Sequence, residues 1–249
     1  MLETEIIKQI TDDLYKIGVN PDDTLMVHSS LKSLGWVEGG ADTVIKAFMS
    51  YLKEGTLLMP ALSYNLKKTA NSRFSVLHTP GCVGTIPEAF RNYPDVIRSV
   101  HPTHSVCAYG KHAAEITARH YLDRTPVGEN SPFRQLIKYN GKILMLGCGL
   151  EPNTFMHGVE EAVGTPYVLS SEPTVFLIEY ADGNTEEASH ITHNFKDVLQ
   201  RYDRVEGILP IKRGKILNAD SYLMDAAVLW DAAAKKIETE ACFFVDNKT

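Results

Sequence analysis

Short apolar runs alternate with longer segments of helical periodicity along most of this chain, and this alternation constrains the fold more than any other feature. Residues 24–28, 56–60 and 142–146 are apolar runs with the length of a buried strand. Apolar residues recur at helical spacing over residues 6–17 and 44–52, ahead of the first two runs. Strands that alternate with helices predict an α/β fold with a mostly parallel central sheet.

Later segments continue the alternation and add an antiparallel element. The further elements that we expect are helices over residues 85–93, 111–119 and 221–236, a helix that opens at Ser131-Pro132, and an extended segment over residues 98–109. A strand over residues 174–180, followed by the turn residues 182–184, predicts a hairpin. The sheet is therefore expected to be mixed.

The composition fits one globular domain. With 249 residues, 44% of them hydrophobic, the chain can bury a substantial core. No Pro- or Ser-rich linker divides it, so residues 1–249 are expected to form a single domain. A run of about 18 apolar residues, which a membrane span would need, does not occur. The N-terminal residues mix charged and apolar side chains from the start, unlike a signal peptide.

The cysteines indicate the redox compartment in which the protein works, and the net charge indicates the kind of partner it binds. The four cysteines, Cys82, Cys107, Cys148 and Cys242, are scattered without a CxxC pair. This pattern fits a reducing cytoplasm and cysteines that act as small, buried apolar residues. The net charge of −6 argues against nucleic-acid binding, which needs clustered Lys and Arg, and is compatible with a cationic partner. We expect a cytoplasmic protein with no nucleic-acid or membrane partner.

The segment after the strand at residues 142–146 carries the strongest catalytic candidates. Sites in an open α/β sheet gather beyond the carboxyl ends of strands, where a helix capped by Asn153 or Thr154 should begin. His157 and Glu160 are three residues apart and would share a face of that helix. A carboxylate beside an imidazole can fix its tautomer and stabilise its protonated form, which makes a general base. An ordinary intrahelical contact is the alternative.

A second candidate site is the loop that follows the first strand and contains Ser29, Ser30 and Leu31. Backbone N–H groups and serine hydroxyls in such a loop can hold phosphate or amide groups. A polar turn without a ligand is the alternative. The chain has no GxGxxG or P-loop pattern, so a Rossmann or Walker nucleotide site is not expected.

Histidines and one cysteine suggest two other chemistries. The histidines form two pairs that invite a metal interpretation, His101 with His104 and His190 with His193. Neither pair has the glutamate of an HExxH helix, and a proline separates the first two, so no metal site is expected. Cys148 is an alternative nucleophile, although most cysteines after a buried strand are packing residues.

Six blocks of sequence occur in a recognisable order. They are residues 27–31 (VHSSL), 84–91 (GTIPEAFR), 98–105 (RSVHPTHS), 128–132 (GENSP), 143–147 (ILMLG) and 153–160 (NTFMHGVE). In this register the chain resembles the aminoglycoside 3-N-acetyltransferase family, which has the antibiotic N-acetyltransferase fold and is distinct from the GNAT acetyltransferases. The blocks cover roughly residues 24–165, and the last third matches by pattern only.

The resemblance implies an α/β/α architecture, acetyl-CoA as donor, and the 3-amino group of a 2-deoxystreptamine aminoglycoside as acceptor. His157 matches the family's catalytic histidine, with Glu160 as its partner and Glu88 as a further acidic candidate. The implied cofactor-binding residues are Ser29, Ser30 and Leu31 along the pantetheine and phosphate path, and Ser105, Val106 and Cys107 on the neighbouring strand.

The residue types agree with direct transfer in a ternary complex. An ammonium group must lose a proton before it attacks a thioester, so an imidazole within reach is useful. The oxyanion needs donors, which the Ser29–Ser30 loop could supply. A polycationic acceptor also needs carboxylates, and the candidates are Glu88, Glu160, Glu161 and the acidic residues between positions 179 and 187.

Other functions remain open. An N-acetyltransferase of the same fold could act on a different amine, because the chain is short between Leu62 and Phe74 and around residues 166–174, where an acceptor-shaping insertion would sit. A metal-dependent hydrolase would instead use His101, His104 and His157. A ligand-binding protein without catalysis is a further alternative, and the chain is expected to be a monomer or a homodimer.

Overall fold

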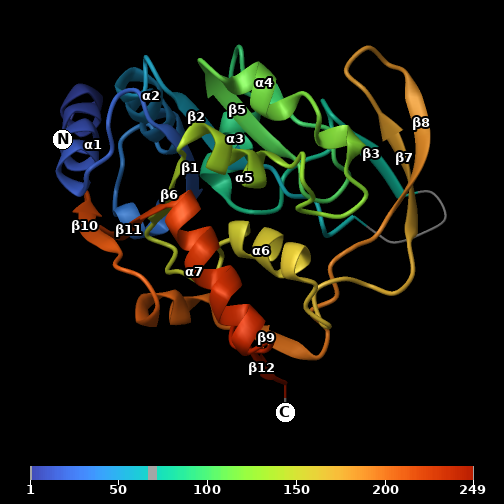
Figure 1. Ribbon diagram of the computed structural model, residues 1–249. Helices are drawn as coiled ribbons and strands as arrows, with labels where there is room; N and C mark the ends of the chain where they lie inside the picture. Colours follow the sequence, from blue (N-terminus) through green and yellow to red (C-terminus); the bar gives the residue numbers. More distant parts are fainter. Residues whose placement is uncertain (1, 67–71, 249) are drawn as a thin grey trace.

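A seven-stranded sheet forms the centre of the protein. The computed structural model describes residues 2–66 and 72–248 (Figure 1). The strand order is β10-β11-β6-β1-β2-β5-β4. Their bounds are β1 Thr24–Ser29, β2 Thr56–Pro60, β4 Ile97–Arg98, β5 Val106–Gly110, β6 Lys142–Leu146, β10 Lys212–Ile216 and β11 Ala219–Asp225.

Parallel pairing is confined to the middle of this sheet. β1 pairs in parallel with β2 and with β6, whereas β5, β4, β11 and β10 extend the sheet by antiparallel pairs. The mixed sheet is as expected. Ser29 lies opposite Leu146, and Pro60 at the end of β2 lies opposite Val106 at the start of β5. Four segments that leave or enter these strands therefore meet at one edge of the sheet.

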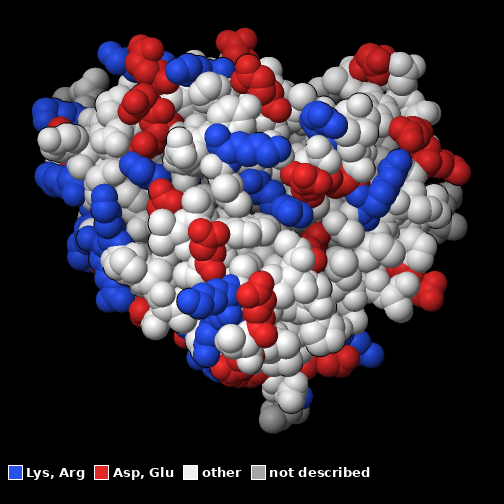
Figure 2. All heavy atoms as spheres, in the orientation of Figure 1, with Lys and Arg blue, Asp and Glu red and all other residues white. Residues whose placement is uncertain are grey.

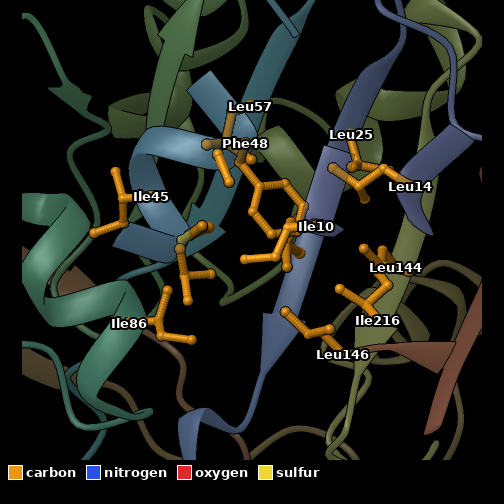
Figure 3. Close-up of a cluster of buried hydrophobic side chains, with 14 of the residues drawn as sticks. Ile10, Leu14, Leu25, Ile45, Phe48, Leu57, Ile86, Leu144, Leu146 and Ile216 are labelled. Carbon is orange, nitrogen blue, oxygen red and sulfur yellow. The ribbon is translucent and has the colours of Figure 1, made fainter. Parts of the chain in front are cut away.

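Helices cover both faces, which confirms the α/β/α layering. The bounds are α1 Glu3–Ile17, α2 Ala41–Tyr51 and α3 Thr85–Arg91 on one face, and α4 Ala113–Thr117, α5 Pro132–Gln135, α6 Phe155–Val163 and α7 Ala226–Thr239 on the other. Successive strand residues alternate between two hydrophobic cores, as a pleated strand requires. Leu25 and Val27 pack into the first core, with Phe48 of α2 (Figure 3), and Met26 packs into the second.

Two smaller sheets lie outside this sandwich. The first consists of β3 Ser72–Ser75, β7 Thr174–Glu179 and β8 Thr185–His190, and the second pairs β9 Val198–Gln200 with β12 Val245–Asn247. The hairpin predicted at residues 182–184 is present between β7 and β8, with Gly183 at a φ of 83°. The described residues also form short 3-10 helices: η1 Leu31–Leu34, η2 His120–Leu122, η3 Leu136–Tyr139 and η4 Tyr202–Gly207.

Two predicted elements were wrong in their extent. Residues 98–109 are not continuously extended, because Nδ1 of His101 accepts hydrogen bonds from the backbone N–H groups of Thr103 (3.3 Å) and His104 (3.0 Å) and holds a turn between β4 and β5. Residues 221–225 are the end of β11 rather than a helix. The helix begins at Ala226, and Asp225 caps it.

The surface and the cysteines complete the picture. Acidic and basic side chains are interspersed over much of the face in Figure 2. All four cysteines are free, and Cys107 is buried as expected, whereas Cys82 and Cys148 are partly exposed and Cys242 is exposed. The expectation of four buried cysteines was therefore wrong. Among the described residues, none of the helices has the length and apolarity that crossing a membrane requires.

Candidate active site

A cavity of about 430 Å³ opens at the sheet edge where the strand ends meet. It is lined from the end of β2, the turn before β5, the loop between β6 and α6, and the segment after β8. The lining residues are Leu62, Tyr64, Val83, Thr103, His104, Glu151, Pro152, Thr154, His157, Thr192, His193, Phe195 and Gln200.

His157 stands in the first turn of α6 and lines this cavity. Its Nδ1 lies 2.6 Å from the hydroxyl of Tyr202 and 3.4 Å from Oε2 of Glu160. The Tyr202 hydroxyl donates to Oε2 of Glu160 at 2.6 Å, and Tyr167 donates to Oε1 at 2.9 Å. Glu160 is fully buried. The predicted His157–Glu160 contact therefore exists, with a tyrosine between the two groups.

These contacts determine the tautomer of His157. Tyr202 has one hydroxyl proton and gives it to the carboxylate of Glu160, which can only accept. The tyrosine oxygen must then accept from Nδ1–H of His157. The proton of a neutral imidazole is thus on Nδ1, and the lone pair is on Nε2. The ring has the protonation pattern of a general base.

The start of α6 differs in one detail from the prediction. Thr154 is the N-cap residue, as expected, but its side chain makes no capping hydrogen bond. The backbone N–H groups of Met156 and His157 instead donate to the carbonyls of Asn153 (3.1 Å) and Thr154 (3.1 Å). The side chain of Thr154 lines the cavity.

A second histidine–glutamate pair lies beside the first. Nε2 of His193 is 2.7 Å from Oε1 of Glu161, which also accepts from the backbone N–H of Val127 at 2.9 Å. Burial raises the pKa of Glu161 to about 7, even though hydrogen bonds and the charge of His157 act in the opposite direction. Burial, and then the charge of His157, hold the pKa of His193 well below its ordinary value. The ring centroids of His193 and His157 are 4.6 Å apart.

A smaller cavity of about 250 Å³ adjoins the first on the side of β1. Its lining residues are His28, Ser29, Pro60, Tyr64, Val83, Pro87, Cys148, Pro152 and Thr154. Within the part of the chain that the structure describes, the buried Oγ of Ser29 has no hydrogen-bond partner. Ser30 bonds to Ser33 and Leu31 opens η1, so this loop is folded as a short helical turn behind Ser29. Of the three predicted residues, Ser29 alone lines this cavity.

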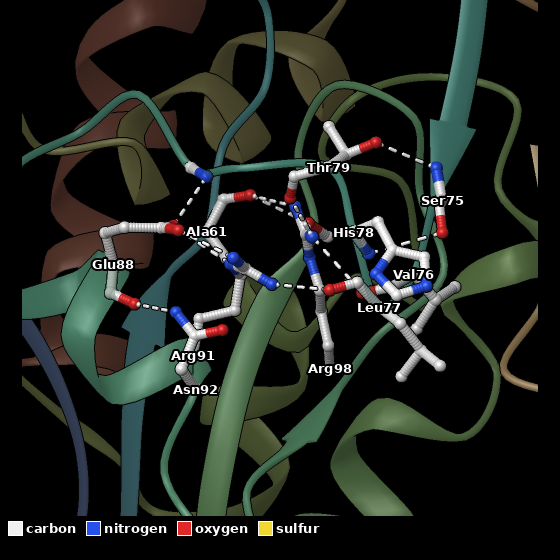
Figure 4. Close-up of polar contacts among 12 residues, drawn as sticks. Ala61, Ser75, Val76, Leu77, His78, Thr79, Glu88, Arg91, Asn92 and Arg98 are labelled. Carbon is white, nitrogen blue, oxygen red and sulfur yellow. Dashed lines mark hydrogen bonds and ion pairs between the residues drawn. The ribbon is translucent and has the colours of Figure 1, made fainter.

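Glu88 is not brought to His157. Its carboxylate forms an ion pair with Arg91 at 2.6 Å and accepts from the backbone N–H of Gly81 at 2.7 Å (Figure 4). Burial alone would raise the pKa of Glu88, but the bonds from Arg91 and Gly81 outweigh it and lower the pKa. Glu88 is absent from the described linings of both cavities and ties α3 to the segment before it.

Ser105, Val106 and Cys107 also lie behind the site rather than in it. The hydroxyl of Ser105 donates to the carbonyl of Ala61 at 2.8 Å and accepts from Arg98 at 2.9 Å. Val106 and Cys107 are fully buried in the two opposite cores. Burial raises the pKa of the Cys107 thiol to about 12. None of the three is among the described lining residues.

The histidines do not support a metal site. Over residues 2–66 and 72–248, no group of three or more His, Cys, Asp or Glu side chains is arranged to hold a metal ion. Nδ1 of His101 is used by the turn before β5, and Nδ1 of His104 is 2.9 Å from Oγ1 of Thr103. Cys148 is also a poor nucleophile, because burial raises its pKa to about 11.

Sequence reasoning missed several residues of the site. Tyr202 and Tyr167 are the partners of Glu160, and Tyr64 and Phe195 line the cavity. Tyr202 is 45 residues away from His157 in the chain, so no local spacing relates them. Of the segment between Leu62 and Phe74, where an insertion was considered, residues 67–71 lie outside the described residues.

A histidine with a fixed tautomer, lining a cavity at the sheet edge of an α/β/α fold, can carry out acid–base catalysis. The model of the aminoglycoside 3-N-acetyltransferase family matches residues 26–238. The chain belongs to this family.

Known relatives agree in sequence and in structure. The chain is 35% identical over 250 residues to the prophage-derived aminoglycoside N(3')-acetyltransferase-like protein YokD of Bacillus subtilis (strain 168), covering 92% of this chain and 90% of the relative. It is similar to the solved structure of AAC-IIIb with CoASH, with 26% identity, a TM-score of 0.81, and coverage of 94% and 96% of the two chains. A histidine-to-alanine mutant of AAC(3)-IVa in complex with a gentamicin shows 25% identity, a TM-score of 0.81, and coverage of 95% and 90%.

Proposed function

We propose that the protein is an acetyl-CoA-dependent N-acetyltransferase that acts on the 3-amino group of 2-deoxystreptamine aminoglycosides, with His157 as the general base. The observation that carries the proposal is the bonding of the His157 ring. Because Tyr202 and Glu160 hold Nδ1 in the protonated form, Nε2 is free to accept a proton from an amine in the cavity.

We assign the acetyl-pantetheine end of the donor to the smaller cavity. A relative has been solved with CoASH, and the smaller cavity adjoins the larger one at Thr154 and Pro152. Acetyl-CoA in this cavity would place its thioester at the junction, close to His157. The unpartnered hydroxyl of Ser29 is the donor that we assign to the oxyanion of the tetrahedral intermediate. The cofactor roles predicted for Ser30, Leu31, Ser105, Val106 and Cys107 would have to be indirect.

Transfer then proceeds in one ternary complex. Nε2 of His157 removes a proton from the ammonium group, and the neutral amine attacks the thioester carbonyl. As His157 becomes cationic, the carboxylate of Glu160 stabilises it through Tyr202. The C–S bond breaks when the intermediate collapses, so no acyl-enzyme is needed.

Glu151 is the carboxylate that we assign to a second ammonium group of the acceptor, because it lines the larger cavity. Sequence reasoning did not predict Glu151, and several of the carboxylates that it did predict already have partners. Glu160 and Glu161 are bonded inside the protein, Glu179 pairs with Arg73, and Glu186 accepts from Tyr180. We also place the protein in the cytoplasm, where acetyl-CoA is available, as a monomer or homodimer.

The cavity lining favours one second candidate, acetylation of a different amine. Its described lining contains a single carboxylate beside the apolar surfaces of Leu62, Tyr64 and Phe195. A polycationic antibiotic would find few counter-charges there, whereas an amine with one or two charges and an apolar body would fit. A panel of aminoglycosides and simpler amines, followed by thiol release from acetyl-CoA, separates the two candidates.

His157→Ala tests the base. We expect kcat to fall by roughly 10²–10⁴-fold, the usual contribution of a general base, while binding of CoA is retained. His112→Ala is the matched control, because His112 is a partly exposed histidine whose partner is Glu115 on α4. Near-normal turnover in His157→Ala would contradict the assignment.

A further inference from the structure

The proposed reaction has more protons to move than His157 can hold at once. The acceptor nitrogen enters as an ammonium group and leaves as an amide, so it loses two protons while the N–C bond forms. The C–S bond breaks, the sulfur leaves with the electron pair and takes up one proton, and the other proton goes to solvent. An imidazole carries one exchangeable proton at its free nitrogen, so a second proton carrier next to it would be useful.

We propose that Glu161 and His193 form a second acid–base pair of the active site, which receives the second proton from the amine. The proposal rests on the proposed transferase function. His193 lines the same cavity as His157, and their rings meet edge to face with centroids 4.6 Å apart. Nε2 of the His193 ring is held by its 2.7 Å contact with Oε1 of Glu161. His193 is the group that would touch the acceptor, and Glu161 acts through it.

The surroundings of the pair favour one shared proton. The side chains of His193 and Glu161 are only 8% and 4% exposed. Burial opposes an imidazolium at His193, and it also opposes a carboxylate at Glu161 until the pH reaches about 7. The pair therefore holds its proton on the acid side of neutrality and gives it up near pH 7, which is the range in which a general acid or base is effective.

Other charged groups face the pair from several elements. His157 on α6 and Arg134 on α5 act against the burial that raises the pKa of Glu161, and burial, with a smaller contribution from Glu161, raises the pKa of Asp123. His104 packs against the opposite side of His193, with ring centroids 4.6 Å apart. Burial lowers the pKa of His104 well below its ordinary value and keeps this ring neutral. In the proposed mechanism, His157 is therefore the neighbour whose change of charge during turnover acts on the Glu161–His193 pair.

A structural role is the alternative, because Glu161 also accepts from the backbone N–H of Val127 and could serve only to hold the chain. Glu161→Gln separates the two roles. A glutamine retains an oxygen that can accept from Val127 but cannot exchange a proton. His193→Gln removes the second carrier from the cavity. His190→Gln is the control, since His190 is also an interior histidine, packs on His101, and is absent from the described linings.

The test combines kinetics with a titration that needs no turnover. We expect Glu161→Gln and His193→Gln to lower kcat by about tenfold or more and to remove an ionisation near pH 7 from the kcat profile, with the KM for acetyl-CoA within about twofold. His190→Gln should keep the profile of the unsubstituted enzyme. The infrared carboxyl band of Glu161, identified as the band that Glu161→Gln removes, should titrate near pH 7, and its midpoint should move in His193→Gln.

Two results would contradict the proposal that Glu161 and His193 act as an acid–base pair. One is a kcat profile of Glu161→Gln that superimposes on that of the unsubstituted enzyme, with only its melting temperature lowered. The other is a Glu161 carboxyl band that titrates below about pH 5, as an ordinary glutamate does. Failure to acetylate any amine would instead contradict the proposed function, and the infrared titration distinguishes that failure from a failure of the pair.

Discussion

At the scale of single residues, Tyr202 has the most specific role in the site. It is 1% exposed, and its hydroxyl connects Glu160 to Nδ1 of His157. Without that hydroxyl, a buried carboxylate oxygen loses a donor, and the ring of His157 loses the acceptor that fixes its tautomer.

Tyr202→Phe should therefore lower both activity and stability. We expect kcat to fall by about tenfold or more because the base is no longer held in one tautomer. The free energy of unfolding should fall by roughly 1–3 kcal/mol, the cost of an unsatisfied buried group. Steady-state kinetics and urea unfolding measure the two effects.

Tyr167→Phe is the matched comparison. Tyr167 bonds to the other oxygen of Glu160 and does not contact His157. We expect the free energy of unfolding to fall in Tyr167→Phe as it does in Tyr202→Phe, but the fall in kcat to be smaller. Equal kcat losses in the two variants would indicate that the tautomer of His157 does not depend on Tyr202.

Some residues of the site could be predicted from the sequence and others could not. His157 and Glu160 could be paired because both lie on one helix, three positions apart. Tyr202 and His193 come from segments that the tertiary fold brings back to α6, so no periodicity marks them. Glu88 was expected in the site because of its sequence block, but its local partner Arg91 occupies its carboxylate.

At the scale of elements, the glycine at position 158 allows α6 to pack closely against its neighbours. A methyl group at Gly158 would lie 2.7 Å from Cγ1 of Val127 and 3.2 Å from Cγ of Arg134. The first distance is shorter than real contacts allow, and the β-branched side chain of Val127 has little freedom to move. Val127 also donates to Glu161, so its displacement would disturb the second pair.

Gly158→Ala should destabilise the protein, although helix propensity predicts the opposite. Replacing a helical glycine by alanine gains about 1 kcal/mol, whereas overpacking a core typically costs about 1–3 kcal/mol. We expect a lower melting temperature by calorimetry. Gly207→Ala is the control, because nothing lies within 4 Å of its added methyl group. A melting temperature that rises in Gly158→Ala would mean that α6 can shift without loss.

Element prediction succeeded where the signal is local. The apolar runs of β1, β2 and β6 are buried on both faces, so their composition alone identifies them. β11 was not predicted, because the helix expected over residues 221–236, from its alanine and leucine content, overlaps the end of this strand. Its extended conformation depends on pairing with β6 and β10, which are distant in sequence.

At the scale of the whole molecule, buried histidines connect the site to the interior. Stacked or edge-to-face rings run from His157 through His193 and His104 to His101, which contacts His120 and His190. Burial lowers the pKa of each member beyond His157, to about 3 for His120 and about 4 for His190. Burial also lowers the pKa of His28, beside the smaller cavity, to about 3.

This set of histidines should make the protein sensitive to mild acid. Below pH 6.5 the unfolded chain binds protons that the folded protein excludes, so stability is present above pH 6.5 and is lost as the pH falls. By pH 5 each such histidine costs about 2 kcal/mol, against a total stability of roughly 5–15 kcal/mol. Glu161 acts in the opposite direction, since its raised pKa favours the folded state at low pH, but it is one group against several.

Calorimetry between pH 7.5 and 5 measures this balance. We expect the melting temperature to fall steeply over that range. His190→Gln should reduce the slope, because it removes one of the excluded protons. A melting temperature that stays constant from pH 7 to pH 5 would show that the buried rings are protonated in the folded protein.

The shared lining of the two adjoining cavities has a consequence for turnover. Tyr64, Val83, Pro152 and Thr154 line both cavities, while each cavity also has residues of its own. If the thioester end of the donor occupies the smaller cavity and the amine the larger one, the two substrates would not compete for the same space. With that assignment, spent CoA would leave room for a fresh amine in the larger cavity. An unproductive complex of CoA with unmodified amine would then form, so the ratio of CoA to acetyl-CoA around the enzyme would limit its rate even when amine is abundant.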